Sequence, residues 1–194
     1  MKQLFVAALL FMQTAAFSQT TWKNDKAHSK LTFTVTHLMV SDVDGLFKNF
    51  DVTIQASKPD FSDAVFSLTA EAASINTEVE MRDNDLKSPN FFDVAKFPVI
   101  TFKSTAIQPV GNNHYKLTGN LTMHCITNPV TMNLVYRGTI VNPMTKKDDA
   151  GFKLTGTINR TDFNIGTKYP SAMISDEVTI KADGEFAKLT KNAQ

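Results

Sequence analysis

The chain has 194 residues, of which 42% are hydrophobic and 20% are charged, with 20 basic and 19 acidic side chains. This length is enough for one domain with a substantial core, and the balanced charge excludes the basic surface that nucleic-acid binding requires. The single cysteine, Cys125, excludes an internal disulfide, so the core has to stabilise the domain by itself.

Residues 1–18 have the organisation of a secretory signal peptide. Lys2 supplies positive charge, residues 4–11 form an apolar run too short to span a bilayer, and Ala16-Phe17-Ser18 offers a small-x-small cleavage site. We therefore predict a signal peptide over residues 1–18 and a single exported domain over residues 19–190. The expected location is periplasmic or secreted, without stable membrane insertion.

Eight segments alternate apolar and polar residues, which is the pattern of β-strands with one apolar face. The clearest is Leu31-Thr32-Phe33-Thr34-Val35-Thr36-His37. The predicted strands are 29–38, 46–56, 64–75, 98–108, 115–125, 129–141, 151–160 and 174–186. The predicted turns include Asp42-Val43-Asp44-Gly45, Lys58-Pro59-Asp60, 111–113, Asn128-Pro129 and 147–149. Such short connections favour an all-β fold, an eight-stranded antiparallel barrel of lipocalin type with up-and-down order.

One connection, between Ser74 and Pro98, is too long for a structureless loop in a compact domain. Ser88-Pro89 resembles an N-cap followed by proline at the first helical position, which predicts a short helix over residues 90–96. Residues 78–86 are a second candidate helix. The segment also carries Phe91, Phe92, Val94 and Phe97, and we expect this apolar insertion to cover the mouth of the barrel.

Periodicity alone does not say which face of the strands points inward. In an outer-membrane barrel the apolar set would face lipid and the polar set would line a channel. Such barrels carry aromatic girdles, whereas this chain has one tryptophan and three tyrosines, so we expect the apolar set to point inward. Two alternatives stay open for the lumen, which is either an apolar pocket or is filled completely by Phe33, Phe66, Phe102, Leu121 and Met132.

Side chains that could perform catalysis or hold a metal are not arranged in recognisable motifs. The four histidines lack metal-ligand spacing, and Asp42-x-Asp44-Gly45 lacks the remaining ligands of a calcium loop. A glycine-rich phosphate loop and a nucleophile elbow are also missing from the sequence. We therefore predict a protein that is not an enzyme, with no catalytic residues, no metal and no required cofactor.

Three other features have structural interpretations. Arg82-Asp83-Asn84-Asp85 and Arg160-Thr161-Asp162-Phe163 combine arginine with carboxylates, which favours networks that fix loops to a barrel end. A smaller possibility is that they hold the polar head of a ligand. Cys125 lies in a predicted apolar strand and is interpreted as a small buried hydrophobic residue.

A series of short motifs runs through almost the whole mature chain. They are Asp25-x-x-His28-Ser29, Phe33-x-Val35-x-His37, Gly45-x-Phe47-x-x-Phe50, Ser74-Ile75-Asn76-Thr77, Arg82-Asp83, Leu86-x-Ser88-x-x-Phe91-Phe92-Asp93, Phe97-Pro98-x-Ile100-Thr101-Phe102-x-Ser104, Gly119-x-Leu121-Thr122 and Arg160-x-Asp162-Phe163. In this order they resemble the YceI-like family of secreted polyisoprenoid-binding proteins. The resemblance implies a lipocalin-like barrel with helices near its mouth, a homodimer, an exported location and no known catalysis. It also implies glycine where this chain has Cys125.

The resulting hypothesis is an exported protein that holds a hydrophobic small molecule, an isoprenoid or isoprenoid quinone, for transport or storage. His37 and Arg82 are the rim candidates. The predicted ligand-binding residues are Leu31, Phe33, Val35, His37, Phe50, Val52, Phe66, Leu68, Arg82, Phe91, Phe92, Ile100, Phe102, Leu121, Met123, Met132, Leu134 and Ile158. Two alternatives remain, a ligand-free barrel that acts as an interaction module and an enzyme on a hydrophobic substrate with His37 or Asp83 as acid/base.

Overall fold

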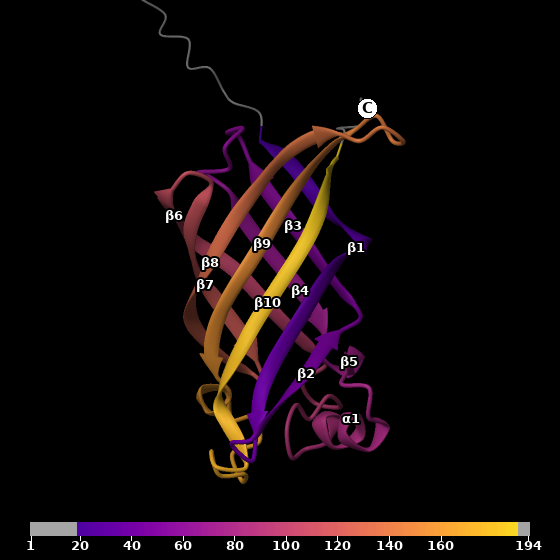
Figure 1. Cartoon of the computed structure of the whole chain (residues 1–194), viewed down its shortest axis with the longest axis vertical. Helices are drawn as coiled ribbons and strands as arrows, with labels where there is room; N and C mark the ends of the chain where they lie inside the picture. Colours follow the sequence, from indigo (N-terminus) through magenta and orange to yellow (C-terminus); the bar gives the residue numbers. More distant parts are fainter. Residues whose placement is uncertain (1–18, 190–194) are drawn as a thin grey trace, which may run out of the picture.

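Strands dominate the structure, a computed structural model that describes residues 19–189 (Figure 1). The predicted signal peptide, residues 1–18, and residue 190 of the predicted domain lie outside the described residues. The elements are β1 (Thr20–His37), β2 (Ser41–Phe47), β3 (Phe50–Ala56), β4 (Val65–Glu71), the 3-10 turn η1 (Ala72–Ser74), β5 (Ile75–Asn76), α1 (Glu80–Lys87), β6 (Val99–Gly111), β7 (His114–Met123), β8 (Ile126–Val141), β9 (Asp148–Asn159), η2 (Arg160–Phe163) and β10 (Ile174–Lys188).

The strands follow one another around a closed barrel, each antiparallel to its neighbours. β1 pairs with β10 on one side and with β2 and β3 on the other, and this closes the sheet. β2 and β3 form one strand interrupted at Lys48-Asn49, and β4 and β5 form another interrupted by η1. Counted in this way, the described residues form the eight-stranded up-and-down barrel that the alternation predicts.

The first strand is longer than the alternation indicates. β1 begins at Thr20, whereas the prediction places its start at residue 29. The pairing of β1 with β10 shifts register between Asn24 and Ser29, so the strand contains a bulge. A bulge inserts unpaired residues and reverses the inward and outward sense of the strand. The period-two pattern is therefore visible only after the bulge.

Two predicted turns lie inside strands, which is a correction to the sequence analysis. Asp42-Val43-Asp44-Gly45 belongs to β2, and Asn128-Pro129 belongs to β8. The chain instead reverses at Leu38-Met39 and at His124-Cys125. Three residues connect β1 to β2, since His37 pairs with Ser41, and two residues connect β7 to β8. Both connections contain a turn with positive φ at its two central residues, which usually selects asparagine and glycine. Neither pair carries that signal, so the sequence pattern misses both turns.

The prediction that Cys125 is a buried strand residue is also wrong, because Cys125 lies in the second of these two turns. Cys125 is exposed in the hairpin between β7 and β8, where Met123 pairs with Ile126. Its φ is +64° and that of His124 is +50°. Glycine adopts such angles without strain, which explains why the glycine implied by the family resemblance suits this position.

The helix of the insertion is α1, which corresponds to the candidate at residues 78–86, and the helix predicted over residues 90–96 is wrong. Ser88 ends α1 rather than beginning a helix, because its N–H and its hydroxyl both bond to the carbonyl of Asp85, at 3.0 and 2.7 Å. The N–H groups of Phe92 and Val94 then bond back to Leu86 and Lys87. These bonds fold residues 90–97 into turns.

The apolar side chains of the strands point into the barrel, as the composition favours. At one end they form a cluster that we call the aromatic plug, made of Trp22, Phe61, Phe66, Tyr136, Phe152 and Phe186. Phe61 comes from the loop between β3 and β4 and folds inward until only 2% of it is exposed. The hydroxyl of Tyr115 donates to the carbonyl of Asp60 and so anchors this loop. The plug closes this end of the barrel.

Candidate ligand-binding cavity

The rest of the barrel is hollow. An inner cavity of about 150 Å³ lies against the aromatic plug, and a mouth cavity of about 300 Å³ lies toward the end that carries α1. The two cavities adjoin, because Phe47, Met123, Ile158 and Ile180 line both of them. We call these shared side chains the waist. The lumen is thus neither filled completely nor fully open, which resolves the alternative that the sequence leaves undecided.

Every residue predicted to bind ligand lines one of the two cavities. The inner cavity is lined by Leu31, Phe50, Val52, Phe66, Leu68, Ile100, Phe102, Leu121, Met123, Met132, Leu134 and Ile158. The mouth cavity is lined by Phe33, Val35, His37, Arg82, Phe91 and Phe92, and also by Met123 and Ile158. The alternation brings the strand residues together because it places them all on the inner face. Their contact with a ligand stays a prediction.

Sequence reasoning misses several lining residues, mostly from the C-terminal part of the chain. The missed apolar side chains include Phe47, Leu154, Ile165, Tyr169, Ile174, Val178 and Ile180. Val178 and Ile180 share one face of β10, so the period-two pattern contains the signal that finds them. Ile165 and Tyr169 lie in the connection before β10, where no periodicity exists, and only the tertiary fold places them at the mouth.

Two glycines give the lumen its shape. Gly45 and Gly119 are buried on the inner faces of β2 and β7. A β-carbon at Gly45 would collide with the ring of Phe33, and one at Gly119 would collide with the ring of Phe102. The absence of side chains at these two positions therefore lets the phenylalanine rings pack against the wall of the barrel.

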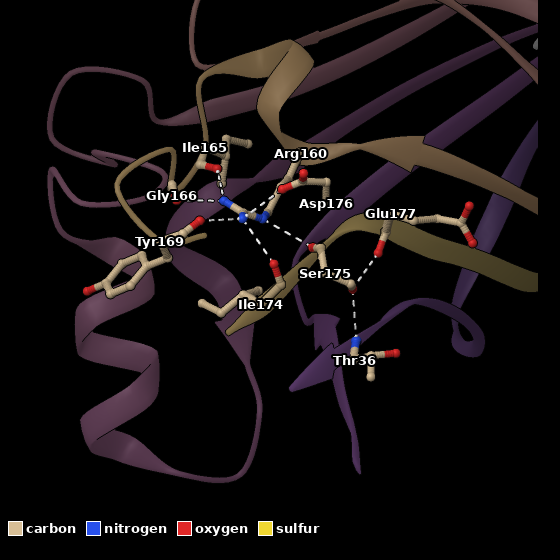
Figure 2. Close-up of polar contacts among 9 residues, drawn as sticks. All are labelled: Thr36, Arg160, Ile165, Gly166, Tyr169, Ile174, Ser175, Asp176 and Glu177. Carbon is tan, nitrogen blue, oxygen red and sulfur yellow. Dashed lines mark hydrogen bonds and ion pairs between the residues drawn. The ribbon is translucent and has the colours of Figure 1, made fainter. Parts of the chain in front are cut away.

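Arg160 organises the rim of the mouth (Figure 2). Its side chain is 4% exposed, and its guanidinium donates to the carbonyls of Ile165, Gly166, Tyr169, Ile174 and Ser175 at 2.5–3.1 Å. It also pairs with Asp176 Oδ1 at 2.8 Å. The network that the sequence analysis expects is therefore present, but its carboxylate comes from β10 and not from the neighbouring Asp162. Arg160 holds residues 165–175 in place across the barrel end.

Arg82 bonds to Thr77 and not to the carboxylates that neighbour it in the sequence. Its Nε donates to Thr77 Oγ1 and its Nη2 donates to the Thr77 carbonyl, both at 2.8 Å. Asp83 in turn accepts the N–H and the hydroxyl of Thr77, at 2.8 and 2.6 Å. Within residues 19–189 no carboxylate forms an ion pair with Arg82. Arg82 therefore lines the mouth cavity with Thr77 between its guanidinium and the carboxylate of Asp83.

The two groups suggested for acid–base chemistry do not form one site. His37 is exposed at the rim, at the end of β1, whereas Asp83 is buried in α1 and bonded to Thr77. The part of the chain that the structure describes contains no group of three His, Cys, Asp or Glu side chains placed to hold a metal ion. Among these residues, no helix has the length and hydrophobicity needed to cross a membrane.

A search against protein families and known proteins gives consistent matches. The model of the YceI-like domain matches residues 22–186. A UPF0312 protein of Staphylococcus aureus (strain N315) is 38% identical over 167 residues, which cover 84% of this chain and 95% of that protein. A second UPF0312 protein, from strain USA300, matches with the same identity and coverage.

Solved structures with the same fold include BcnA of Burkholderia cenocepacia, with a TM-score of 0.74 and 26% identity over 86% of this chain and 99% of that chain. The YceI protein of Campylobacter jejuni has a TM-score of 0.73 and 29% identity over 80% of this chain and 90% of that chain. A polyisoprenoid-binding domain from Saccharophagus degradans has a TM-score of 0.66 at 14% identity and covers 89% of this chain and 100% of that chain, which shows the fold alone.

Proposed function

Because the chain belongs to the YceI-like family, we propose that it is an exported protein that binds one long apolar amphiphile inside its barrel, for transport or storage. The class of ligand that we propose is a polyisoprenoid or an isoprenoid quinone. No other cofactor is needed for this function. The family resemblance also implies a homodimer, which remains a prediction.

The observation that carries this proposal is the shape of the lumen. The inner cavity is lined almost entirely by apolar side chains, reaches the aromatic plug at Phe66, Phe152 and Phe186, and adjoins the mouth cavity at the waist. A hydrocarbon tail gains about 0.8 kcal/mol for each methylene that it buries, so a long tail binds tightly through burial alone. An elongated apolar lumen that meets the aromatic plug at one end therefore suits a chain-shaped ligand with its polar end at the mouth.

The mouth offers partners for that polar end. Arg82 faces the mouth cavity, and Tyr169 and Asp85 lie beside it, joined by a hydrogen bond of 3.4 Å from the tyrosine hydroxyl to Asp85 Oδ2. A guanidinium donates to carbonyl or phosphate oxygens, and a hydroxyl both donates and accepts. The head group would therefore lie at the rim, with the tail directed toward Phe152.

Mass spectrometry of extracts from the protein tests the proposal directly. We expect a prenylated lipid to co-purify with protein made in its native host, and the stripped protein to take up a prenylated quinone. Repeated absence of any bound amphiphile, together with no uptake of the quinone, would contradict the proposal and favour the alternative of a ligand-free interaction module.

A variant at the waist tests the location of the tail. Ile158 lies between the two cavities, and Ile158→Phe would narrow the passage to the inner one. We expect the affinity for a long polyprenol to fall by roughly tenfold or more, since the inner part of the tail is excluded, while a short prenol keeps its affinity. Ile140→Phe, on the exposed part of β8, is the matched control. Equal losses in both variants would contradict binding through the waist.

A further inference from the structure

The hairpin between β1 and β2 ends in three exposed apolar side chains. Leu38, Met39 and Val40 are 50%, 76% and 83% exposed, and we call them the apolar tip. Exposed apolar residues are common singly, but a run of three at the end of a hairpin forms a surface that water solvates poorly. Within the described residues, the apolar tip protrudes at the same end of the barrel as α1 (Figure 1).

The backbone of the apolar tip is strained for the residues that it contains. Leu38 and Met39 have φ angles of +52° and +59°, and the N–H of Val40 bonds to the carbonyl of His37 at 3.2 Å. Asparagine or glycine adopts these angles at lower cost than a long apolar side chain does. The chain thus gives up stability to hold apolar side chains that stay half or more exposed, which indicates a function outside the fold.

The apolar tip is joined to the rim of the mouth cavity. The N–H of Leu38 donates to the carbonyl of Met173 at 2.9 Å, and both Met173 and His37 line that cavity. Met81 and Val79, which are 83% and 46% exposed, lie at the same end in and beside α1. Apolar surface therefore extends from outside the barrel to the opening of the lumen.

We propose that this end of the barrel docks on a phospholipid bilayer, with the apolar tip inserted among the lipids. The inference rests on the proposed function in one respect, because an amphiphile with a long tail is found in hydrocarbon and has to reach the lumen from there. The exposed apolar groups lie on two separate segments, the hairpin with Leu38 and Met39 and the helix with Met81. A bilayer receives such groups without a groove of fixed shape, and its binding scales with the apolar area that is buried. A docked mouth would let the tail pass between bilayer and lumen without crossing water.

The charges beside the apolar tip define the kind of bilayer. Asp42 and Asp44 follow the tip on β2 and are exposed, and each accepts a bond from a threonine of β1, at 2.9 and 2.6 Å. Carboxylates at this position repel anionic head groups. We therefore assign the surface to zwitterionic lipid, with apolar insertion rather than charge attraction as the source of affinity.

Flotation of the full protein with phosphatidylcholine vesicles that contain no isoprenoid tests the docking. The decisive variant is Met39→Asn, because asparagine suits the positive φ but removes the apolar group. We expect its vesicle partition coefficient to fall by roughly tenfold while its Tm rises. Met144→Asn is the matched control, since Met144 is 90% exposed on the loop at the opposite end of the barrel and should leave vesicle binding unchanged.

Three results would overturn the docking: wild-type protein that does not float with the vesicles, a Met144→Asn variant that loses as much binding as Met39→Asn, or stronger binding to anionic than to zwitterionic vesicles. Uptake of a prenylated quinone from detergent micelles is measured in parallel on the same variants. A wild-type protein that takes up the quinone from micelles but does not bind vesicles contradicts the docking alone, whereas a wild-type protein that takes up no quinone contradicts the proposed function. Met39→Asn should keep its uptake from micelles while it loses vesicle binding.

Discussion

At the scale of single residues, Arg160 shows how one buried charge can stabilise a loop without secondary structure. Residues 165–173 cross the barrel mouth between η2 and β10, and the carbonyls of Ile165, Gly166 and Tyr169 accept hydrogen bonds from Arg160. A buried carbonyl without a donor costs about 1–3 kcal/mol. The fork of five N–H donors on arginine satisfies several of them at once, which lysine cannot do because it offers a single point charge.

Replacing Arg160 with methionine should therefore destabilise the fold strongly. Arg160→Met leaves several carbonyls of the mouth loop without their donor, whereas Asp176 is partly exposed and can be solvated. Because each buried carbonyl left unpaired costs about 1–3 kcal/mol, we expect the free energy of unfolding to fall by about 3 kcal/mol or more. Urea denaturation measures this loss. Arg137→Met is the control, since Arg137 forms an exposed pair with Asp183 at 3.7 Å and its loss should cost about 0–1 kcal/mol. Similar losses in the two variants would contradict this role.

His28 and Asp25 form an ion pair in the bulge of β1. The two atoms His28 Nδ1 and Asp25 Oδ2 lie 3.0 Å apart. The hydrogen bond to Asp25 raises the pKa of His28 above its ordinary 6.5, and the same bond, followed by the N–H of Ala27, lowers the pKa of Asp25 below 3.8. The raised histidine pKa stabilises the fold below pH 6.5, and the lowered carboxyl pKa stabilises it above pH 3.8. The pair therefore contributes most between these values, and its contribution disappears as the pH rises through the folded-state pKa of His28.

Asp25→Asn should abolish this pH dependence. We expect the pKa of His28 to fall toward 6.5 in an NMR titration of its ring protons. The difference in unfolding free energy between wild type and variant should be largest in the mildly acidic range and smaller in alkaline solution, where His28 is neutral. Glu185→Gln is the comparison, because Glu185 Oε2 lies 4.0 Å from His28 Nδ1 and contributes less to the shift. If Asp25→Asn leaves the pKa of His28 unchanged, the raised pKa does not come from the bond to Asp25.

At the scale of elements, the loop between β3 and β4 closes the far end of the barrel. Phe61 has a φ of +58° and inserts its ring between Trp22, Tyr136 and Phe152, with centroid distances of 5.3, 5.0 and 5.0 Å. The sequence identifies this segment as a turn through Lys58-Pro59-Asp60, but it gives no sign that Phe61 enters the barrel. A single aromatic residue in a loop has no periodicity, so only packing can show where its ring lies.

Phe61→Ala should open the aromatic plug. We expect a loss of about 3–5 kcal/mol in the free energy of unfolding, because a fully buried ring is replaced by a cavity. Urea denaturation gives the loss, and a crystal structure of the variant should show the inner cavity extended toward the far end. Phe97→Ala is the control, since Phe97 is partly exposed beside His124 and should cost about 1 kcal/mol. A loss for Phe61→Ala no larger than that of the control would contradict the role of the plug.

At the scale of the whole molecule, the hollow lumen separates this barrel from an ordinary core. Protein interiors are normally packed as densely as organic crystals, so empty cavities of about 150 and 300 Å³ forfeit contacts along their walls. Leu31, Phe33 and Val35 face the interior and yet are only half-buried, since their inner sides border empty space. A ligand that fills this space would add the missing contacts.

The stripped protein should therefore be less stable than the loaded one. A ligand that binds only the folded state raises the unfolding free energy by about 4 kcal/mol at a thousandfold excess over its Kd. Urea midpoints of stripped protein with and without a long polyprenol measure the effect. Ile158→Phe is the comparison, where the polyprenol should raise the midpoint less. An unchanged midpoint for the wild type would contradict a lumen that is completed by a ligand.

The sequence by itself determined the class of fold, the walls of the lumen and the family. Period-two alternation is a local property: it places Leu31, Phe33 and Val35 on one face wherever the strand ends up, and a closed sheet has one inner face. The same alternation made many of the lining residues on the strands predictable in advance. Their contact with a ligand stays a prediction.

Only the tertiary structure decided how far the lumen is filled and which loops meet at its mouth. The turns at Leu38-Met39 and His124-Cys125 depend on positive φ angles that their residue types do not announce. The positions of Phe61 and Tyr169, and the choice of Asp176 rather than Asp162 as the partner of Arg160, result from contacts between segments distant in the sequence. Such contacts leave no periodic trace, because packing and hydrogen-bond satisfaction select them only after the barrel has closed.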